Sequence, residues 1–210
     1  MIPLLLMLAG ADTAAKTPLE AERAFAADAK AIGQWTAFRK WSADDAVMFV
    51  PQPTNAHEFL KDRKDPAEAI DWWPTASYIS CDGKTAVNTG GWRRPDGSVG
   101  FFSTVWKRRK GGDWKWYIDG GDETKVALDR PERPRVVRAP CRKNSFRPGP
   151  YEDPPPPPSG PAYSANRVIS DDGTLAYMWR VDANGAREFT VMLAGSERPV
   201  IDDRIAAPAK

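Results

Sequence analysis

The chain has 210 residues, of which 41% are hydrophobic, 28% charged and 10% aromatic, including nine Trp. This composition can bury a core, so a wholly disordered chain is excluded. A net charge of +2 does not favour general binding to nucleic acid, and one His with two Cys excludes a zinc finger or an iron–sulfur cluster. We therefore expect no metal, no cofactor and no nucleic-acid partner, and no apolar run is long enough for a transmembrane span.

The N-terminal residues form a short apolar run that ends in Ala9-Gly10-Ala11. A triplet of small residues after an apolar run is the pattern that signal peptidase cleaves. We therefore predict a signal peptide and leader over 1–16, with a mature chain that begins near Asp12. Such a protein works in the periplasm or is secreted, where disulfides persist. A packed or disordered N-terminal tail is the alternative.

Helical signals begin at Thr17. Residues 17–20 form a capping box, with Thr17 as N-cap and Glu20 at the third helical position. Apolar residues then recur at helical spacing until Gly33, which ends the helix. The following segments predict a second helix over 34–45, an extended stretch ending at Pro51 and a third helix over 65–72.

From Thr75 the apolar period changes to two, which indicates strands. The predicted strands are 76–81, 84–94, 99–109 and 114–121, joined by Gly, Pro and Asp residues typical of hairpin turns. The glycine pairs 90–91 and 120–121 lie inside strands and predict bulges that curl the sheet. Helices followed by an antiparallel meander indicate an α+β fold.

Composition changes after Asp129, because residues 130–161 hold eleven of the twenty prolines and many basic residues. Proline neither donates to a ladder nor continues a helix, so this segment is predicted to be an extended linker. A patch for anionic lipid or nucleic acid is the alternative. Three short strands are predicted within 162–210, over 174–181, 187–193 and 198–202. The chain thus divides into a leader (1–16), a domain (17–129), a basic Pro-rich linker (130–161) and a C-terminal extension (162–210).

The two cysteines, Cys81 and Cys141, are a candidate disulfide pair. In an exported chain with only two cysteines, pairing is favoured, and the bond would tie the linker to the sheet. Two isolated thiols are the alternative.

Residues 17–123 resemble the nuclear-transport-factor-2-like superfamily, which includes SnoaL-like and ketosteroid-isomerase-like proteins. The resemblance rests on the capped first helix, the segment GQWTAFRKWSADDAVMFVP, the WWP turn and the hairpins around SCDGKTAVNTGGW and TVWKRRKGGDWKWYIDGG. In that family a Gly joins the first two helices and a phrase like ADDA precedes an extended segment ending in Pro. The resemblance implies a cone-shaped, cystatin-like α+β fold, in which a curved antiparallel sheet packs on N-terminal helices around a deep pocket. Here a Pro-rich connector and a short C-terminal β-meander follow.

Ketosteroid-isomerase-like enzymes of this family use a carboxylate base, a Tyr and a protonated Asp. Laid over this chain without gaps from the helix-joining Gly to the Pro, the base position falls on Val50, the Tyr position on Ala26 and the second acid near Thr104. Val50 and Ala26 have no proton to exchange, and Thr104 is not a carboxylic acid. That chemistry is therefore not expected, and His57 reads as a solvated loop residue. Asp119 is the remaining candidate acid or base, because an apolar setting raises the pKa of a carboxyl group. A turn cap, or an ion pair at the rim of the sheet, is the alternative role for Asp119.

The resemblance and strand alternation together place Tyr117 and Asp119 on the concave face of the last strand, with Phe102, Thr104 and Trp106 on its neighbour. The predicted lining residues are Phe49, Trp72, Tyr78, Trp92, Phe102, Thr104, Trp106, Tyr117 and Asp119. We expect an exported protein that binds a small apolar or amphipathic molecule, with no established catalysis. The alternatives are a polyketide-cyclase-like or hydratase-like enzyme that uses Asp119, and a protein-interaction module whose pocket is filled by its own aromatic side chains.

The same alternation leaves an apolar patch on the outer face of the sheet. Its predicted members are Trp114, Trp116, Ile118, Phe101 and Val105. An exposed patch of this kind has to be covered. In the family a second subunit often packs there, which implies a homodimer through this face; the C-terminal strands are the alternative cover.

Overall fold

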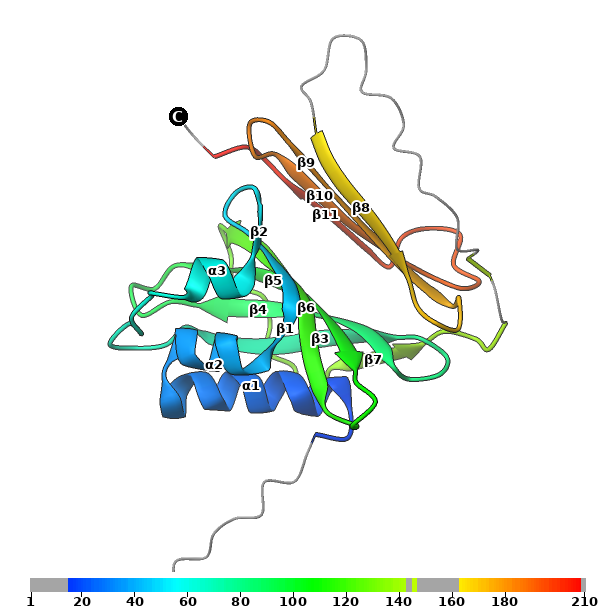
Figure 1. Ribbon diagram of the computed structural model, residues 1–210, viewed down its shortest axis with the longest axis horizontal. Helices are drawn as coiled ribbons and strands as arrows, with labels where there is room; N and C mark the ends of the chain where they lie inside the picture. The colour runs from blue at the N-terminus through cyan, green and yellow to red at the C-terminus, as the bar shows by residue number, and fades with distance from the viewer. Residues whose placement is uncertain (1–14, 143–144, 147–162, 209–210) are drawn as a thin grey trace, which may run out of the picture.

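The computed structural model describes residues 15–142, 145–146 and 163–208. It has the predicted α+β architecture. Two N-terminal helices pack on one face of a curved seven-stranded sheet, and a second, four-stranded sheet lies on the opposite side (Figure 1). Residues 1–14 of the predicted leader and most of the Pro-rich part of the predicted linker lie outside the described residues.

The helices α1 (Pro18–Ile32) and α2 (Gln34–Trp41) form a layer under the main sheet. The capping box is present: the Glu20 amide donates to Thr17 Oγ1 at 3.1 Å, and the Thr17 amide donates to the Glu20 carboxylate at 3.2 Å. Gly33 joins the two helices with a φ of +104°, a conformation that favours glycine. The apolar stripe of α1 faces the sheet and places its side chains in the core.

The predicted helix over 65–72 is wrong. Asp65 instead caps α2, since its carboxylate accepts hydrogen bonds from the Thr36 amide at 2.9 Å and the Thr36 hydroxyl at 2.6 Å. The end of the predicted helix belongs instead to a strand of the main sheet, Asp71–Ile79. The third helix, α3, is Ala56–Leu60, and Asn55 caps it by accepting from the Glu58 amide at 3.1 Å.

The main sheet has the strand order β2-β1-β6-β5-β4-β3-β7. Its strands are β1 (Ser42–Phe49), β2 (Pro53–Asn55), β3 (Asp71–Ile79), β4 (Thr85–Arg93), β5 (Val99–Arg108), β6 (Trp114–Thr124) and β7 (Arg135–Arg138). Strands β3 to β6 form the predicted antiparallel meander. However, β1 pairs with β6 in parallel and β7 pairs with β3 in parallel, so the sheet is mixed rather than antiparallel throughout. Strand β7 comes from the segment predicted to be linker.

Three register shifts interrupt the main sheet, and none lies within a glycine pair: one is between Ser42 and Val47 of β1 opposite β6, and the other two affect the meander. Thr75 is an extra residue in β3 opposite β4, and Tyr117 is an extra residue in β6 opposite β5. Each one-residue bulge exchanges the inward and outward faces of its strand. The prediction of bulges at 90–91 and 120–121 is therefore wrong.

The glycines of those pairs serve close backbone approach instead. A Cβ atom on Gly90 would lie 2.0 Å from the carbonyl oxygen of Trp73, and one on Gly121 would lie 2.0 Å from the carbonyl oxygen of Phe101. Side chains at these positions would collide with main chain, so glycine permits the local bend of the sheet.

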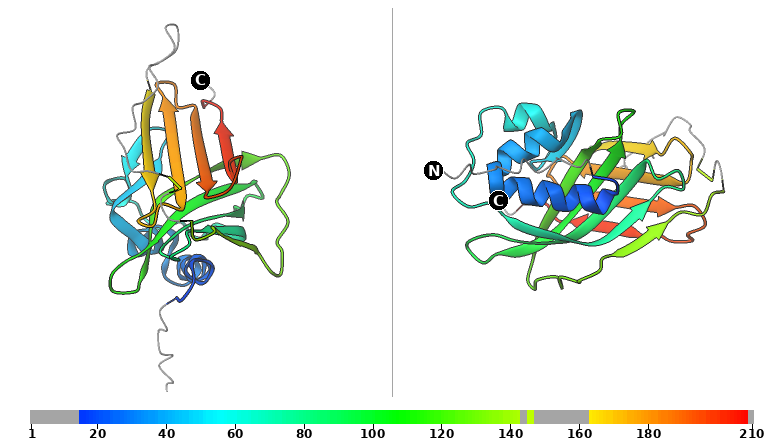
Figure 2. Two further views of the ribbon diagram at one scale, coloured as in Figure 1. Left: turned by 90° about the vertical axis from the view of Figure 1, so that its right-hand side faces the viewer. Right: turned by 90° about the horizontal axis from the view of Figure 1, so that it is seen from below.

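The second sheet contains β8 (Tyr163–Ile169), β9 (Leu175–Asp182), β10 (Arg187–Leu193) and β11 (Ile201–Ile205), paired antiparallel in the order β11-β10-β9-β8. The left view of Figure 2 shows its four strands side by side above the main sheet. Its buried side chains share one core with the outer face of the main sheet. This outer core includes Val87, Val105, Ile118, Leu175, Tyr177, Val181, Phe189 and Val191.

The outer face of the main sheet is therefore covered by the chain itself. Val105 and Ile118 are 0% and 5% exposed beneath the second sheet. Trp114 and Trp116 do not lie on this face at all; they belong to the inner core against the helices, because the Tyr117 bulge reverses the alternation. The apolar contact predicted for a second subunit is occupied by the C-terminal strands.

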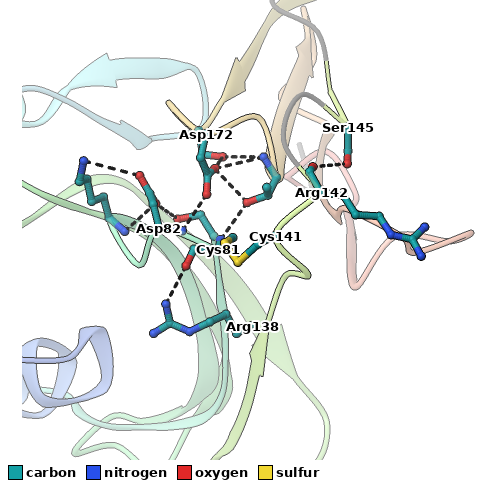
Figure 3. The surroundings of a disulfide bond; sticks show 11 residues. Cys81, Asp82, Arg138, Cys141, Arg142, Ser145 and Asp172 are labelled. Carbon is teal, nitrogen blue, oxygen red and sulfur yellow. Dashed lines mark hydrogen bonds and ion pairs between the residues drawn. A yellow bond between two sulfur atoms is a disulfide. The ribbon is translucent and has the colours of Figure 1, made fainter.

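A disulfide joins Cys81, after β3, to Cys141, after β7, with a Cα–Cα distance of 5.1 Å (Figure 3). The Cys81 amide also donates to Thr174 Oγ1 at 2.8 Å, and the Asp82 amide donates to Asp172 at 2.7 Å. The disulfide thus lies where the β3–β4 and β8–β9 turns meet. In the described part of the chain, no helix is long and apolar enough to cross a membrane.

Candidate functional site

A cavity of about 300 Å³ lies between the N-terminal helices and the inner face of the main sheet. Its apolar wall consists of Phe25, Trp35, Phe38, Met48, Phe49, Ile70, Trp72, Trp92, Phe101 and Phe102. The rings meet edge to face: the centre of Phe25 lies 4.7 Å from that of Phe38 and 4.8 Å from that of Trp72. A volume of this size is at the lower end of the range for small-molecule sites.

Glu22 of α1 is a carboxyl group at the cavity wall and is fully buried. The indole N–H groups of Trp72 and Trp106 donate to it at 2.9 and 2.7 Å, and the Asn88 side-chain amide donates at 3.1 Å. These hydrogen bonds lower its pKa, but burial outweighs them and raises the pKa of Glu22 to about 7. Glu22 therefore exchanges a proton near neutral pH.

Asp119 of β6 is the second carboxyl group of the cavity. Thr104 Oγ1 donates to it at 2.8 Å. Burial raises the pKa of Asp119 to about 6, against the opposing effects of the Thr104 hydrogen bond and the positive charge of Arg187. The charge of Asp119 in turn raises the pKa of Glu22, so the two groups interact. Carboxyl groups that titrate near neutral pH inside a cavity are typical of functional sites.

The cavity is also lined by four further charged residues, together with Gln34 and the glycines 120–121: Arg94, Asp122, Glu123 and Arg187. Arg94 forms an ion pair with Glu123. The Arg187 guanidinium donates to the carbonyl of Gly121 and lies 5.7 Å from the ring centre of Phe49. Because Arg187 belongs to β10, the C-terminal sheet contributes directly to the cavity.

The structure brings five of the nine predicted lining residues to the cavity. They are Phe49, Trp72, Trp92, Phe102 and Asp119. Thr104 and Trp106 are fully buried behind the wall, where they hold the Asp119 and Glu22 carboxyl groups through hydrogen bonds.

Tyr78 and Tyr117 lie away from the cavity wall. Tyr78 follows the Thr75 bulge and packs in the outer core, and Tyr117 is itself the bulged residue of β6, with its ring centre 4.7 Å from Lys107 Nζ. If side chains are assumed to alternate along each strand as though it had no bulge, both tyrosines are assigned to the wrong face of the sheet.

His57 lies on α3 and is half-buried, with Nε2 3.0 Å from Ser42 Oγ, so it is not the solvated loop residue predicted. It does not line the cavity. Across the described ranges, no group of three or more His, Cys, Asp or Glu side chains is arranged to hold a metal ion.

Glu22 and Arg187 were not predicted as site residues. The sequence did contain a signal for Glu22, because this residue lies on the buried stripe of α1 between Ala21 and Phe25. It also lies one turn before Ala26, the position at which the resemblance implies a catalytic Tyr. A charged residue on an apolar stripe is unusual enough to mark a functional position. Arg187 had no such signal, because its place depends on how the second sheet packs.

No protein-family model and no curated protein matches the sequence. Among solved structures, the chain is similar to one described as a "putative ketosteroid isomerase" from Parabacteroides distasonis, at 17% identity over 55% of this chain and 94% of that chain, with a TM-score of 0.45. It is also similar to a "putative aromatic ring hydroxylase" from Novosphingobium aromaticivorans, at 16% identity over 52% and 87% of the two chains, with a TM-score of 0.37. Structural similarity this low supports no inference about activity. Any inference about activity has to rest on the geometry of the cavity.

Proposed function

We propose that this protein is an exported member of the nuclear-transport-factor-2-like superfamily that binds a small, flat molecule in its cavity. The cavity carries this proposal: about 300 Å³ of space with a largely aromatic wall and few polar groups. Such a wall stabilises a flat ligand by apolar burial, worth about 25 cal/mol per Å² before ordering costs. The polar groups then fix its orientation.

Export to the periplasm or the cell exterior is supported by two features. One is the apolar run that precedes the Ala9-Gly10-Ala11 triplet, and the other is the Cys81–Cys141 disulfide. Structural disulfides persist in oxidising compartments and are rare in the cytosol.

Calorimetric titration with 1-naphthylmethanol, a neutral two-ring probe, tests binding in the cavity. Ile70→Trp fills the space next to the Trp72 wall, so we expect it to weaken binding at least tenfold. Phe59→Ala is the control, because Phe59 lies outside the cavity lining with its ring centre 3.8 Å from the Arg63 guanidinium carbon. Binding of the probe that survives Ile70→Trp unchanged would contradict the proposal.

A second candidate function is a cyclase-like or hydratase-like enzyme. The observation in its favour is the place of Asp119 in the cavity wall, where it accepts a hydrogen bond from Thr104 Oγ1. Burial there raises its pKa to about 6, which suits a general acid or base near neutral pH. If the protein is a binder, Asp119→Asn should change the affinity for a neutral ligand less than fivefold. If it is an enzyme, the same substitution should lower turnover of the ligand identified by native mass spectrometry by about 10²–10⁴-fold.

A protein-interaction module with a filled pocket has less support. Its own aromatic rings would have to occupy the space between helices and sheet, whereas the structure leaves about 300 Å³ open there.

A further inference from the structure

The cavity is acidic although the chain is basic. Its charged lining residues are Glu22, Asp119, Asp122, Glu123, Arg94 and Arg187. With all six ionised, four carboxylates against two guanidinium groups give the cavity a charge of −2, whereas the whole chain carries +2. A negatively charged cavity discriminates between ligands that have the same shape but differ in charge.

The unbalanced charge of the cavity lies around Asp119 and Glu22. At the rim, Glu123 is neutralised by Arg94. Arg187 lies within 4.0 Å of no carboxylate among the described residues; its charge acts at longer range on Asp119, Asp122 and Asp203. A single guanidinium shared among three acids leaves net negative charge beside Asp119.

Among the described residues, the hydrogen-bond donors to Glu22 and Asp119 are all neutral groups. Glu22 accepts from two indoles and one amide, and Asp119 accepts from the hydroxyl of Thr104. Neither carboxylate has a salt-bridge partner within the described part of the chain. Two interacting acids without a counter-ion are stabilised either by protons or by a bound cation.

The rings around these acids suit an organic cation. Trp35, Phe38 and Trp72 present aromatic surface to the same space. Aromatic faces attract an ammonium group electrostatically and also bury the apolar body that carries it. A bare metal ion would need several oxygen ligands in place of this apolar wall.

We propose that the cavity selects a small organic cation, a protonated amine on a flat apolar body, with its charge beside Asp119 and Glu22. This inference rests on the proposed binding function and adds the charge of the ligand. An anion of the same shape would meet Asp119, Asp122 and Glu22 with only Arg187 to balance them. A neutral analogue makes the same apolar contacts but does not neutralise the charges of Asp119 and Glu22.

Protons and a bound cation compete for the Asp119 and Glu22 carboxylates, so the proposal predicts a specific pH dependence of affinity. The pKa values of Asp119 and Glu22 are about 6 and about 7, so both groups are largely protonated at about pH 5 and ionised at about pH 8. An alkylammonium ion stays charged over this interval. Its affinity should therefore rise with pH, while the affinity of a neutral probe stays constant.

Calorimetric titration with three matched probes provides the test: 1-naphthylmethylamine as cation, 1-naphthylmethanol as neutral analogue and 1-naphthoate as anion. At about pH 8 we expect the amine to bind at least tenfold more tightly than the alcohol, and the naphthoate to bind most weakly. At about pH 5 the advantage of the amine should fall at least tenfold. Asp119→Asn should remove most of this advantage, whereas Asp62→Asn, which changes an exposed acid outside the cavity, should leave it intact.

Equal binding of amine and alcohol, or preference for naphthoate, would overturn the cation proposal while leaving the binding function standing. Failure of all three probes to bind would contradict both. Glu22→Gln provides a second variant with the same expected direction, so the result does not depend on the folding of Asp119→Asn alone.

Discussion

Glu22 is a costly side chain to bury, and its neighbours reduce that cost without removing it. Trp72, Trp106 and Asn88 supply three hydrogen bonds, which stabilise the ionised form. The pKa nevertheless stays at about 7, so the folded protein favours the protonated carboxyl group over most of the acidic range. Ionisation of Glu22 therefore destabilises the fold.

The pH dependence of stability follows from this pKa. A carboxyl group whose pKa is higher in the folded chain stabilises the fold below its unfolded pKa, and the contribution is lost as pH rises through the folded value of about 7. Between about pH 5 and about pH 8, we expect the free energy of unfolding to fall by about 2 kcal/mol more in the unmodified protein than in Glu22→Gln. Urea denaturation at both pH values measures this.

Glu68→Gln is the matched control for that comparison, because Glu68 is exposed and outside the cavity lining. Asp119 acts in the same direction as Glu22 and is retained in both proteins, so part of the slope remains in Glu22→Gln. The same slope in Glu22→Gln as in the unmodified protein would show that Glu22 does not titrate as described.

Thr104 sets the pKa of Asp119 from behind the cavity wall. Its hydroxyl stabilises the ionised carboxylate, so Thr104→Val should raise the pKa of Asp119 above about 6. Ser103→Ala is the control, since Ser103 faces the other side of β5 and donates to Asp203 at 2.7 Å. Carboxyl-carbon NMR titration distinguishes the two variants. An unmoved pKa in Thr104→Val would contradict this role.

At the level of strands, the success of the sequence predictions depended on regular alternation. It placed Trp92, Phe102 and Val105 on the correct faces of β4 and β5, which pair with each other without a register shift. It failed for Tyr78 and Tyr117, because each strand concerned contains a bulge. Neither bulged residue is a glycine, so no composition signal marks the reversal.

The cavity was predictable in part for the same reason. Trp92, Phe102 and Asp119 lie in predicted strands, and the capped first helix follows from its sequence signature. Trp72 lines the cavity from β3, although the sequence placed it in a helix. The contribution of Arg187 did not follow, because sequence patterns define β10 as a strand but do not define the sheet face against which it packs.

Gly121 lines the cavity and lies where β6 closely approaches the main chain of β5. A methyl group there would lie 2.0 Å from the Phe101 carbonyl oxygen, which is main chain and has to shift. We expect Gly121→Ala to destabilise the protein by about 1–3 kcal/mol. Gly111→Ala is the control: its nearest contact is Asp113 Oδ1 at 3.3 Å, so its effect should stay within about 0.5 kcal/mol. Equal midpoints of chemical denaturation would contradict this explanation.

At the scale of the whole molecule, the second sheet replaces an external partner on the outer face. It buries Val87 and Val105 completely and supplies Arg187 to the cavity. The C-terminal extension is therefore part of the same core as the main sheet, and its loss would affect both stability and the site.

The Cys81–Cys141 disulfide fixes this arrangement at the meeting point of the two sheets. The bond closes a loop with a sequence separation of 60, for which chain entropy gives about 4 kcal/mol of stabilisation. We expect the Cys81→Ser, Cys141→Ser double variant to lose stability of this order in urea denaturation. If both cysteines of the non-reduced, denatured protein react with an alkylating reagent, the bond is absent and the explanation fails.

Fluorine NMR of protein labelled with 5-fluorotryptophan tests most directly whether the cavity is the binding site. Trp35, Trp72 and Trp92 line the cavity, whereas Trp73 and Trp179 lie outside its wall. On addition of 1-naphthylmethylamine or 1-naphthylmethanol, we expect the first three signals to shift most and the last two to stay in place. Shifts confined to Trp73 and Trp179, or no shift with either probe, would contradict a ligand site in the cavity.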